Sequence, residues 1–160
     1  MKKFLYALIF VLTIIVLPSC NENNQEDNTP AEELLIGTWK LQSYSFTYKE
    51  NGKKVASGTY IATDDFYNIL SFRMDGSFTE FVMEKYWNEE RTGTWISFSN
   101  TLIFNYNSED DFYITEPTSF TIVSISKTKV TLRESRKYDD DVSSNKKYYE
   151  DIYDYTYTKN

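Results

Sequence analysis

Histidine is absent from all 160 residues of the sequence. It is the commonest general base and the commonest metal ligand, so its absence excludes the Ser-His-Asp and Cys-His arrangements of nucleophilic catalysis and argues against a zinc centre. Glycine is also scarce, and the five glycines are too scattered to form a phosphate-binding loop. We therefore expect no enzyme, no catalytic residues, no cofactor and no metal ion.

Cysteine and basic residues are the other shortages. Cys20 is the single cysteine, so the chain cannot form an internal disulfide. The 17 Lys and Arg residues are outnumbered by 24 Asp and Glu, which gives a formal net charge of −7. Nucleic acids are bound through basic patches, so we expect no nucleic-acid partner. The three prolines are too few for a Pro-rich low-complexity chain.

The first twenty residues have the layout of a secretory signal peptide. Lys2 and Lys3 precede an apolar run over residues 4–17 that is interrupted only by Thr13. The closing residues 17–20, Leu-Pro-Ser-Cys, resemble the bacterial lipobox. That resemblance implies cleavage of residues 1–19 and fatty acylation of Cys20, for example with palmitate. A transmembrane helix is the alternative, but the run is shorter than the roughly 20 residues that span a bilayer; an ordinary signal peptide with a free thiol is another.

Residues 20–33 are expected to be a lipidated tether. Residues 21–30 contain no aliphatic or aromatic side chain and cannot bury enough apolar surface to order themselves. Their acidic residues are compatible with the signals that direct lipoproteins to the outer face in some Gram-negative groups. We expect an outer-membrane lipoprotein of the cell envelope, exposed at the surface, monomeric and attached to the membrane through lipid on Cys20.

The remaining residues, 34–160, predict a single all-β domain. Aromatic residues make up 18% of the chain and favour strands. Asn51-Gly52 and Asp75-Gly76 are hairpin turn signals between strand-like runs. Sequential hairpins predict an antiparallel up-and-down β-barrel of about eight or nine strands. The expected strands are residues 38–48, 55–62, 68–74, 77–86, 92–98, 101–106, 119–126, 129–136 and 148–158.

The start of this domain resembles the lipocalins. That family opens its first strand with Gly-x-Trp after a short helical turn, as in Gly37-Thr38-Trp39, and Arg91-Thr92-Gly93-Thr94-Trp95 is similar to a mid-domain strand of small bacterial lipocalin-like lipoproteins. The resemblance implies a barrel base built on Gly37, Trp39 and Trp95. Many lipocalins stack an Arg from the last strand on the first Trp; this chain offers Lys159 there, which lacks the planar guanidinium.

Aromatic residues at strand spacing are the candidate ligand-binding residues. Trp39 and Leu41 alternate in one phase and Tyr44, Phe46 and Tyr48 in the other, which predicts a β-bulge near Ser43. Core packing is the alternative interpretation of such stripes, since most are core. The candidate ligand-binding set is Tyr44, Phe46, Phe72, Tyr153 and Tyr155.

Acidic residues offer two further interpretations. Strand carboxylates usually face water, which is what we expect of Glu80, Glu84 and Glu134. Residues 139–150 match the spacing of oxygen ligands in a calcium loop, but Ser144 stands where such a loop needs glycine, so we expect a solvated acidic loop.

These features together favour a membrane-anchored, non-enzymatic binding module. An eight-stranded barrel can hold one small ligand, here apolar or amphipathic. The alternative is a cell-surface interaction protein that binds an envelope protein or a glycan through exposed aromatic residues and acidic loops.

Overall fold

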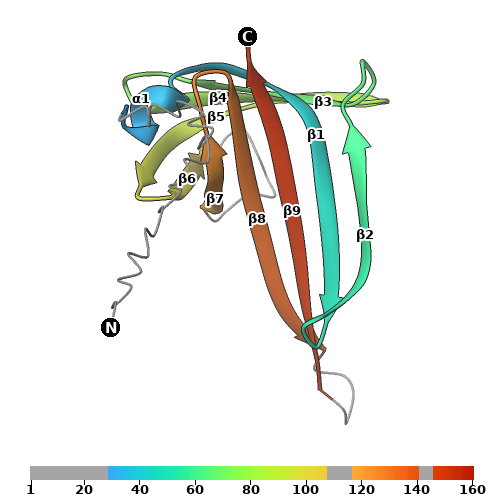
Figure 1. The fold of residues 1–160 in the computed structure, drawn as a ribbon. Coiled ribbons are helices and arrows are strands. Elements are labelled where there is room, and N and C mark those ends of the chain that lie inside the picture. The colour runs from blue at the N-terminus through green and yellow to red at the C-terminus, as the bar shows by residue number, and fades with distance from the viewer. Residues whose placement is uncertain (1–28, 108–116, 141–145) are drawn as a thin grey trace, which may run out of the picture.

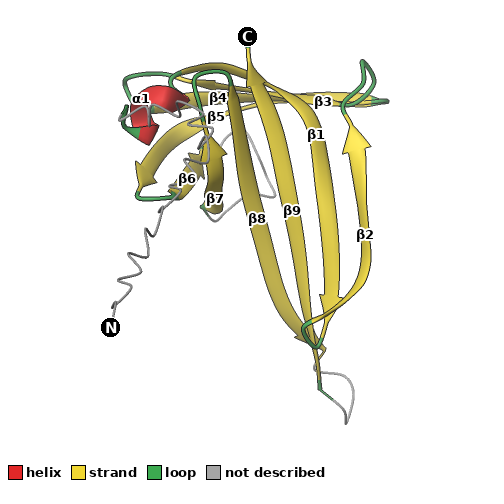
Figure 2. Cartoon of the chain, viewed as in Figure 1, coloured by secondary structure: helices red, strands yellow, loops and turns green. Residues whose placement is uncertain are grey.

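The computed structural model describes residues 29–107, 117–140 and 146–160. These residues form one short helix, α1 (Ala31–Leu35), and antiparallel strands (Figure 2). None of the described helical segments is long and apolar enough to cross a membrane. The strands are β1 (Gly37–Glu50), β2 (Lys53–Ile61), β3 (Tyr67–Phe72), β4 (Ser77–Glu84), β5 (Trp87–Phe98), β6 (Thr101–Tyr106), β7 (Thr118–Ile125), β8 (Lys129–Asp140) and β9 (Lys147–Lys159).

The strands close into a barrel. Their order in the sheet is β2-β1-β3-β4-β5-β6-β7-β8-β9, and β1 also pairs with β9. Eight strands therefore form a closed ring, and β2 is an additional strand attached to β1 alone. The expected antiparallel up-and-down barrel is confirmed, and closure removes the exposed edges that the ring would otherwise present.

Strand β1 changes its neighbour along its length. Its first residues, Gly37 to Lys40, pair with β3, whereas Ser43 to Glu50 pair with β2. Its other edge pairs with β9 throughout, with the expected register shift between Leu41 and Ser43. The strands β2, β1, β9 and β8 consequently continue beyond the barrel as an open sheet (Figure 1).

The closed end of the barrel is a packed apolar core. Trp39 is fully buried, and its indole Nε1 donates a hydrogen bond to the carbonyl oxygen of Leu35 in α1, at 2.7 Å. Lys159 lies across the same indole, with Nζ 4.9 Å from the ring centroid and 3.0 Å from the carbonyl oxygen of Leu34. The lysine thus covers Trp39 through a cation–π contact. The other core residues are Leu41, Leu70, Phe72, Phe78, Trp95, Leu102, Phe104, Ile122, Val130, Leu132 and Tyr157.

Two glycines are required by this packing. Gly37 has a φ of +125°, and a Cβ there would lie 2.7 Å from Cε of Lys159. A Cβ on Gly93 would lie 2.2 Å from the carbonyl oxygen of Asn105 on the neighbouring strand. Gly37 is therefore required by its backbone conformation, since the end of the Lys159 side chain can shift, whereas Gly93 is required by the close approach of the neighbouring backbone.

Some predicted strand ends are wrong. Residues 88–91 were expected to form a polar tip, but they belong to β5 because that strand pairs with β4 as far as Trp87. Residues 137–140 were expected in a loop, yet they extend β8 along β9. Met74, expected to end the strand over residues 68–74, lies in the following turn and is 89% exposed.

Candidate functional site

A cavity of about 290 Å³ opens above the packed base, inside the barrel. Its floor includes Leu41 and Tyr157, and its walls come from strands all around the ring. Charged and aromatic side chains share these walls. The lining residues are Leu41, Phe66, Asn68, Glu80, Val82, Glu84, Arg91, Tyr106, Thr118, Phe120, Glu134, Arg136, Tyr155 and Tyr157.

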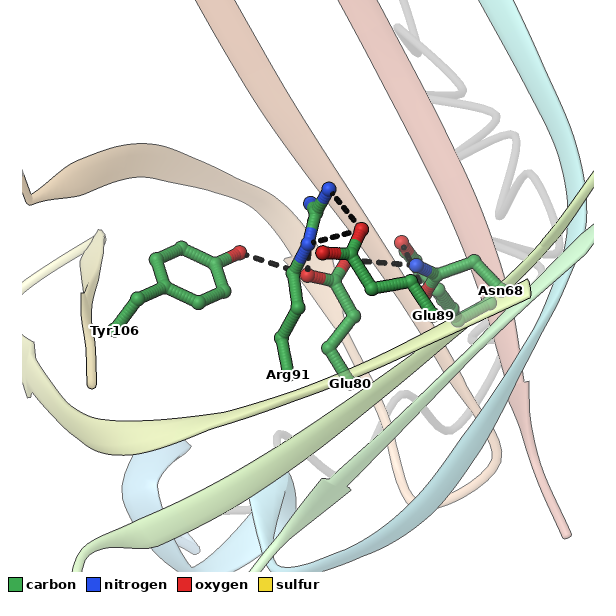
Figure 3. Close-up of polar contacts among 6 residues, drawn as sticks. Asn68, Glu80, Glu89, Arg91 and Tyr106 are labelled. Carbon is green, nitrogen blue, oxygen red and sulfur yellow. Dashed lines mark hydrogen bonds and ion pairs between the residues drawn. The ribbon is translucent and has the colours of Figure 1, made fainter. Parts of the chain in front are cut away.

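Glu80 of β4 is the centre of a polar cluster on one wall. Its carboxylate accepts a hydrogen bond from Nδ2 of Asn68 at 2.7 Å and another from the hydroxyl of Tyr106 at 2.9 Å. Nη1 of Arg91 lies 3.7 Å from the same carboxylate. Figure 3 shows these side chains converging from neighbouring strands. Two hydrogen-bond donors and one guanidinium, from three strands, therefore fix one carboxylate in the barrel interior.

The cluster continues on both sides of Glu80. Arg91 donates from Nε and Nη2 to Oε2 of Glu89, at 2.9 and 2.5 Å (Figure 3). The amide oxygen of Asn68 accepts a hydrogen bond from the hydroxyl of Tyr157, at 3.2 Å. The charges are thereby paired within the protein, and the network links the cavity wall to the buried core.

A second polar group lies on β8, which is the strand diametrically opposite β4 in the ring. Glu134 accepts a hydrogen bond from Nε of Arg136 at 2.6 Å and one from the hydroxyl of Tyr155 at 3.4 Å. The guanidinium of Arg136 lies 6.0 Å from the ring centroid of Tyr153. The cavity is therefore bordered by a carboxylate on each of two facing walls.

The tyrosines beside these carboxylates are held neutral. Burial, and secondly the charge of Glu80, raises the pKa of Tyr106 far above its usual 10.0. Burial and then Glu134 act in the same way on the pKa of Tyr155. A neutral phenol is a hydrogen-bond donor, so both side chains remain donors at physiological pH.

An aromatic face extends from the cavity along the open sheet. Tyr155, which lines the cavity, has its ring centroid 6.0 Å from that of Tyr44 and 6.3 Å from that of Tyr153. The contacts continue from Tyr44 to Tyr60 and, through Tyr153, to Tyr48. The strand pairing places all members on the same side of the sheet: Tyr44, Phe46, Tyr48, Tyr60, Tyr138, Tyr149, Tyr153 and Tyr155.

The candidate ligand-binding residues from the sequence divide between two places. Tyr44, Phe46, Tyr153 and Tyr155 are brought together on the aromatic face. Phe72 lies instead in the packed base and is 2% exposed. Leu70 on the same strand is already buried, and Phe72 lies two residues further toward the closed end of the barrel, where it pairs with Gly37.

The other selected residues lie elsewhere. Gly37, Trp39 and Trp95 are at the base, where the indole Nε1 of Trp95 donates to the carbonyl oxygen of Arg73 at 3.2 Å. Cys20 lies outside the described residues.

The interpretation of the strand carboxylates is wrong. Glu80 and Glu134 line the cavity with side chains only 12% and 13% exposed. Glu84 also lines it, but its carboxylate accepts an exposed hydrogen bond from Nε1 of Trp87 at 3.0 Å. The sequence held a signal for this, because Glu80 alternates in phase with Phe78 and Val82, and Glu134 with Leu132. The apolar neighbours identify the inward face, and the acids share it.

The calcium-loop spacing finds no support in the described residues. Asp139 is paired with Nζ of Lys146 at 2.6 Å, which lowers the pKa of that carboxyl group. Glu150 is paired with Lys49 at 2.9 Å. Residues 141–145 lie outside the described residues, and no metal-binding group of three His, Cys, Asp or Glu occurs among those that are described.

Similarity to known proteins is remote. No protein-family model and no curated protein matches the sequence. Among solved structures, an uncharacterized protein from Bacteroides eggerthii is similar at a TM-score of 0.46 and 14% identity, over 79% of this chain and 99% of the other. A lipocalin-like protein from Bacteroides uniformis is similar at a TM-score of 0.42 and 14% identity, over 75% of this chain and 96% of the other.

Proposed function

We propose that this chain is a non-enzymatic binding module whose barrel holds one small amphipathic ligand. The observation that carries the proposal is the cavity itself, where paired charges and tyrosine hydroxyls lie above a packed apolar floor. A pocket of this kind combines apolar area with a few fixed polar groups, which is how small-molecule sites obtain affinity and orientation.

The pairing of the polar groups in the cavity supports binding over proton transfer. Glu80 and Glu134 each have a guanidinium and a phenol as partners, so the carboxylates are satisfied before any ligand arrives. A general base needs a carboxylate free to accept a proton from substrate. Prearranged hydrogen-bonding groups instead lower the ordering cost of binding a ligand with matching hydroxyl or amide groups.

Attachment to a membrane is the second part of the proposal. The lipobox-like residues before Cys20 support acylation of that cysteine, and the polar residues that follow support a tether that holds the barrel at the envelope surface, most simply as a monomer. Stable anchoring needs more than one acyl chain, which a lipoprotein cysteine provides. Fractionation of a Cys20→Ser variant tests this: we expect soluble protein, and retention in the membrane pellet would contradict the anchor.

Native mass spectrometry of protein purified from its own host tests the binding function. We expect a bound small molecule in the wild-type protein and its loss in Val82→Trp, because Val82 lines the cavity and the larger side chain fills it. Val123→Trp is the matched control, since Val123 lies on β7 and is 47% exposed. Ligand-free wild-type protein, or equal occupancy in both variants, would refute the proposal.

A further inference from the structure

We propose that the ligand is a neutral glycan chain, whose terminal sugar enters the cavity and whose following sugars stack on the aromatic face. This inference rests on the proposed binding function and names the class of ligand. The argument uses the size of the cavity, the continuity of the aromatic face with it, and the pairing of charges on both surfaces.

The cavity is too small for the whole of a typical ligand. Its volume of about 290 Å³ is at the lower end of the roughly 300–1,000 Å³ found for ligand pockets. Polar groups lie among its apolar lining, with Glu80, Asn68 and Arg91 on one wall and Glu134 on the other. A small, hydroxyl-bearing end group therefore fits inside, and the rest of the ligand must lie outside the mouth.

The aromatic face begins where the cavity ends. Tyr155 belongs to both, and the rings of Tyr153 and Tyr155 are nearly parallel, at an interplanar angle of 22°. These residues are two positions apart on one strand, a spacing of roughly 6.7 Å. Tyr60 is 53% exposed and Tyr138 is 52% exposed, so the face is open to solvent. A ligand leaving the cavity meets flat rings at regular intervals along the open sheet.

Charge pairing indicates that the ligand is neutral. Two cations of this face are already paired, Arg136 with Glu134 at 2.6 Å and Lys147 with Glu50 at 2.9 Å. A cationic ligand would have to displace these cations from Glu134 and Glu50. An anionic ligand would approach Glu84 at the mouth and Asp151 on the sheet, where like charge opposes it.

Hydroxyl groups along the aromatic face favour sugars over alkyl chains. The hydroxyl of Tyr153 donates to that of Tyr48 at 3.3 Å, and the hydroxyl of Tyr138 donates to Asp151 at 3.3 Å. An alkyl chain would strip water from these groups without replacing its hydrogen bonds, which is costly. A sugar presents an apolar ring face to an aromatic ring and hydroxyls at its edge, so it satisfies both parts of this surface.

The test uses the Cys20→Ser protein, which keeps the whole chain after the signal peptide in solution. Saturation-transfer NMR would be recorded with linear neutral oligosaccharides of glucose, xylose, mannose and galactose, from one to six sugars. We expect at least one series to bind, with affinity rising with length. Tyr48→Ala and Tyr153→Ala should each lower the affinity for the hexasaccharide by roughly 3- to 10-fold and leave the affinity for the monosaccharide unchanged.

Phe98→Ala is the control, because Phe98 is 82% exposed and ends β5 beyond Trp95, at the packed base. Binding that does not depend on length, or that survives both tyrosine substitutions, would overturn the glycan assignment, as would stronger binding of dodecanoate, spermidine or an extended peptide. These results would leave the cavity function standing if Val82→Trp still displaced the co-purified molecule. Failure of that displacement refutes the cavity function itself.

Discussion

Alkaline pH should unfold this protein steeply, because three tyrosines are buried beside carboxylates. Burial, and then Glu80, holds the pKa of Tyr106 and Tyr157 far above the usual 10.0, and Glu134 adds to the effect of burial on Tyr155. Below pH 10 both the folded and the unfolded chain keep these protons, so the full stability is present. Above pH 10 the unfolded chain loses them while the folded chain does not, and stability falls as pH rises.

The magnitude follows from the number of groups. Each tyrosine that stays protonated in the folded state removes roughly 1.4 kcal/mol of stability per pH unit above 10. Three of them remove roughly 4 kcal/mol per unit. A domain with the usual 5–15 kcal/mol of stability should therefore unfold between about pH 11 and pH 13.5.

Two signals measured together check this. Phenolate absorbance should rise in a first step near pH 10, which is about the usual pKa of a solvated tyrosine. A second absorbance step should coincide with loss of the far-ultraviolet circular dichroism of the sheet. Urea unfolding at several pH values gives the free energy of unfolding as a function of pH. Above pH 10 this free energy should fall with pH about one third less steeply in Tyr106→Phe than in the wild-type protein. Complete tyrosine titration near pH 10 in a folded protein would refute the burial argument.

Four further substitutions have definite expected outcomes in urea or thermal unfolding. Gly93→Ala should lower the free energy of unfolding by several kcal/mol, because its Cβ would meet a carbonyl oxygen at 2.2 Å. Gly52→Ala meets nothing within 4 Å and should lower it by only about 1 kcal/mol, because of its positive φ. Equal losses of stability would be inconsistent with the close approach at Gly93. Lys159→Ala should cost about 1–3 kcal/mol through the lost hydrogen bond and cation–π contact at Trp39, and no loss would mean that the lysine does not cover the base. Arg133→Ala should change stability by at most about 1 kcal/mol, since its ion pair is exposed.

Strand identity was predictable from local pattern, whereas the position of each residue around the ring was not. The turn at Asn51-Gly52 and the strand that contains Leu70 and Phe72 were predicted, because each is determined by residues adjacent in the sequence. The bulge near Ser43 was also visible as a change of phase. Strand β1 pairs with β3 near its start and with β2 further along. This change of partner depends on which strands meet in space, and no single stretch of sequence predicts it.

The candidate site shows the same limit. The aromatic set was selected because alternation is visible in one strand, and four of its five members do share a face. Glu80 and Glu134 were assigned to solvent on a general preference of carboxylates, although their own strands place them in phase with core residues. That preference failed because each acid has a donor from a neighbouring part of the sheet: Asn68 of β3 and Tyr106 of β6 donate to Glu80, and Tyr155 of β9 donates to Glu134.

The pairing of β1 with β9 also has a consequence for how the protein folds. The bond from Lys159 to Leu34 joins residues that are 125 positions apart, so the ring cannot close until the last strand has been synthesised. Contacts of such long range make folding slow, because the entropy of a long loop must be lost before they form. Late closure is compatible with the export proposed above, because a chain whose barrel has not yet closed can still be extended.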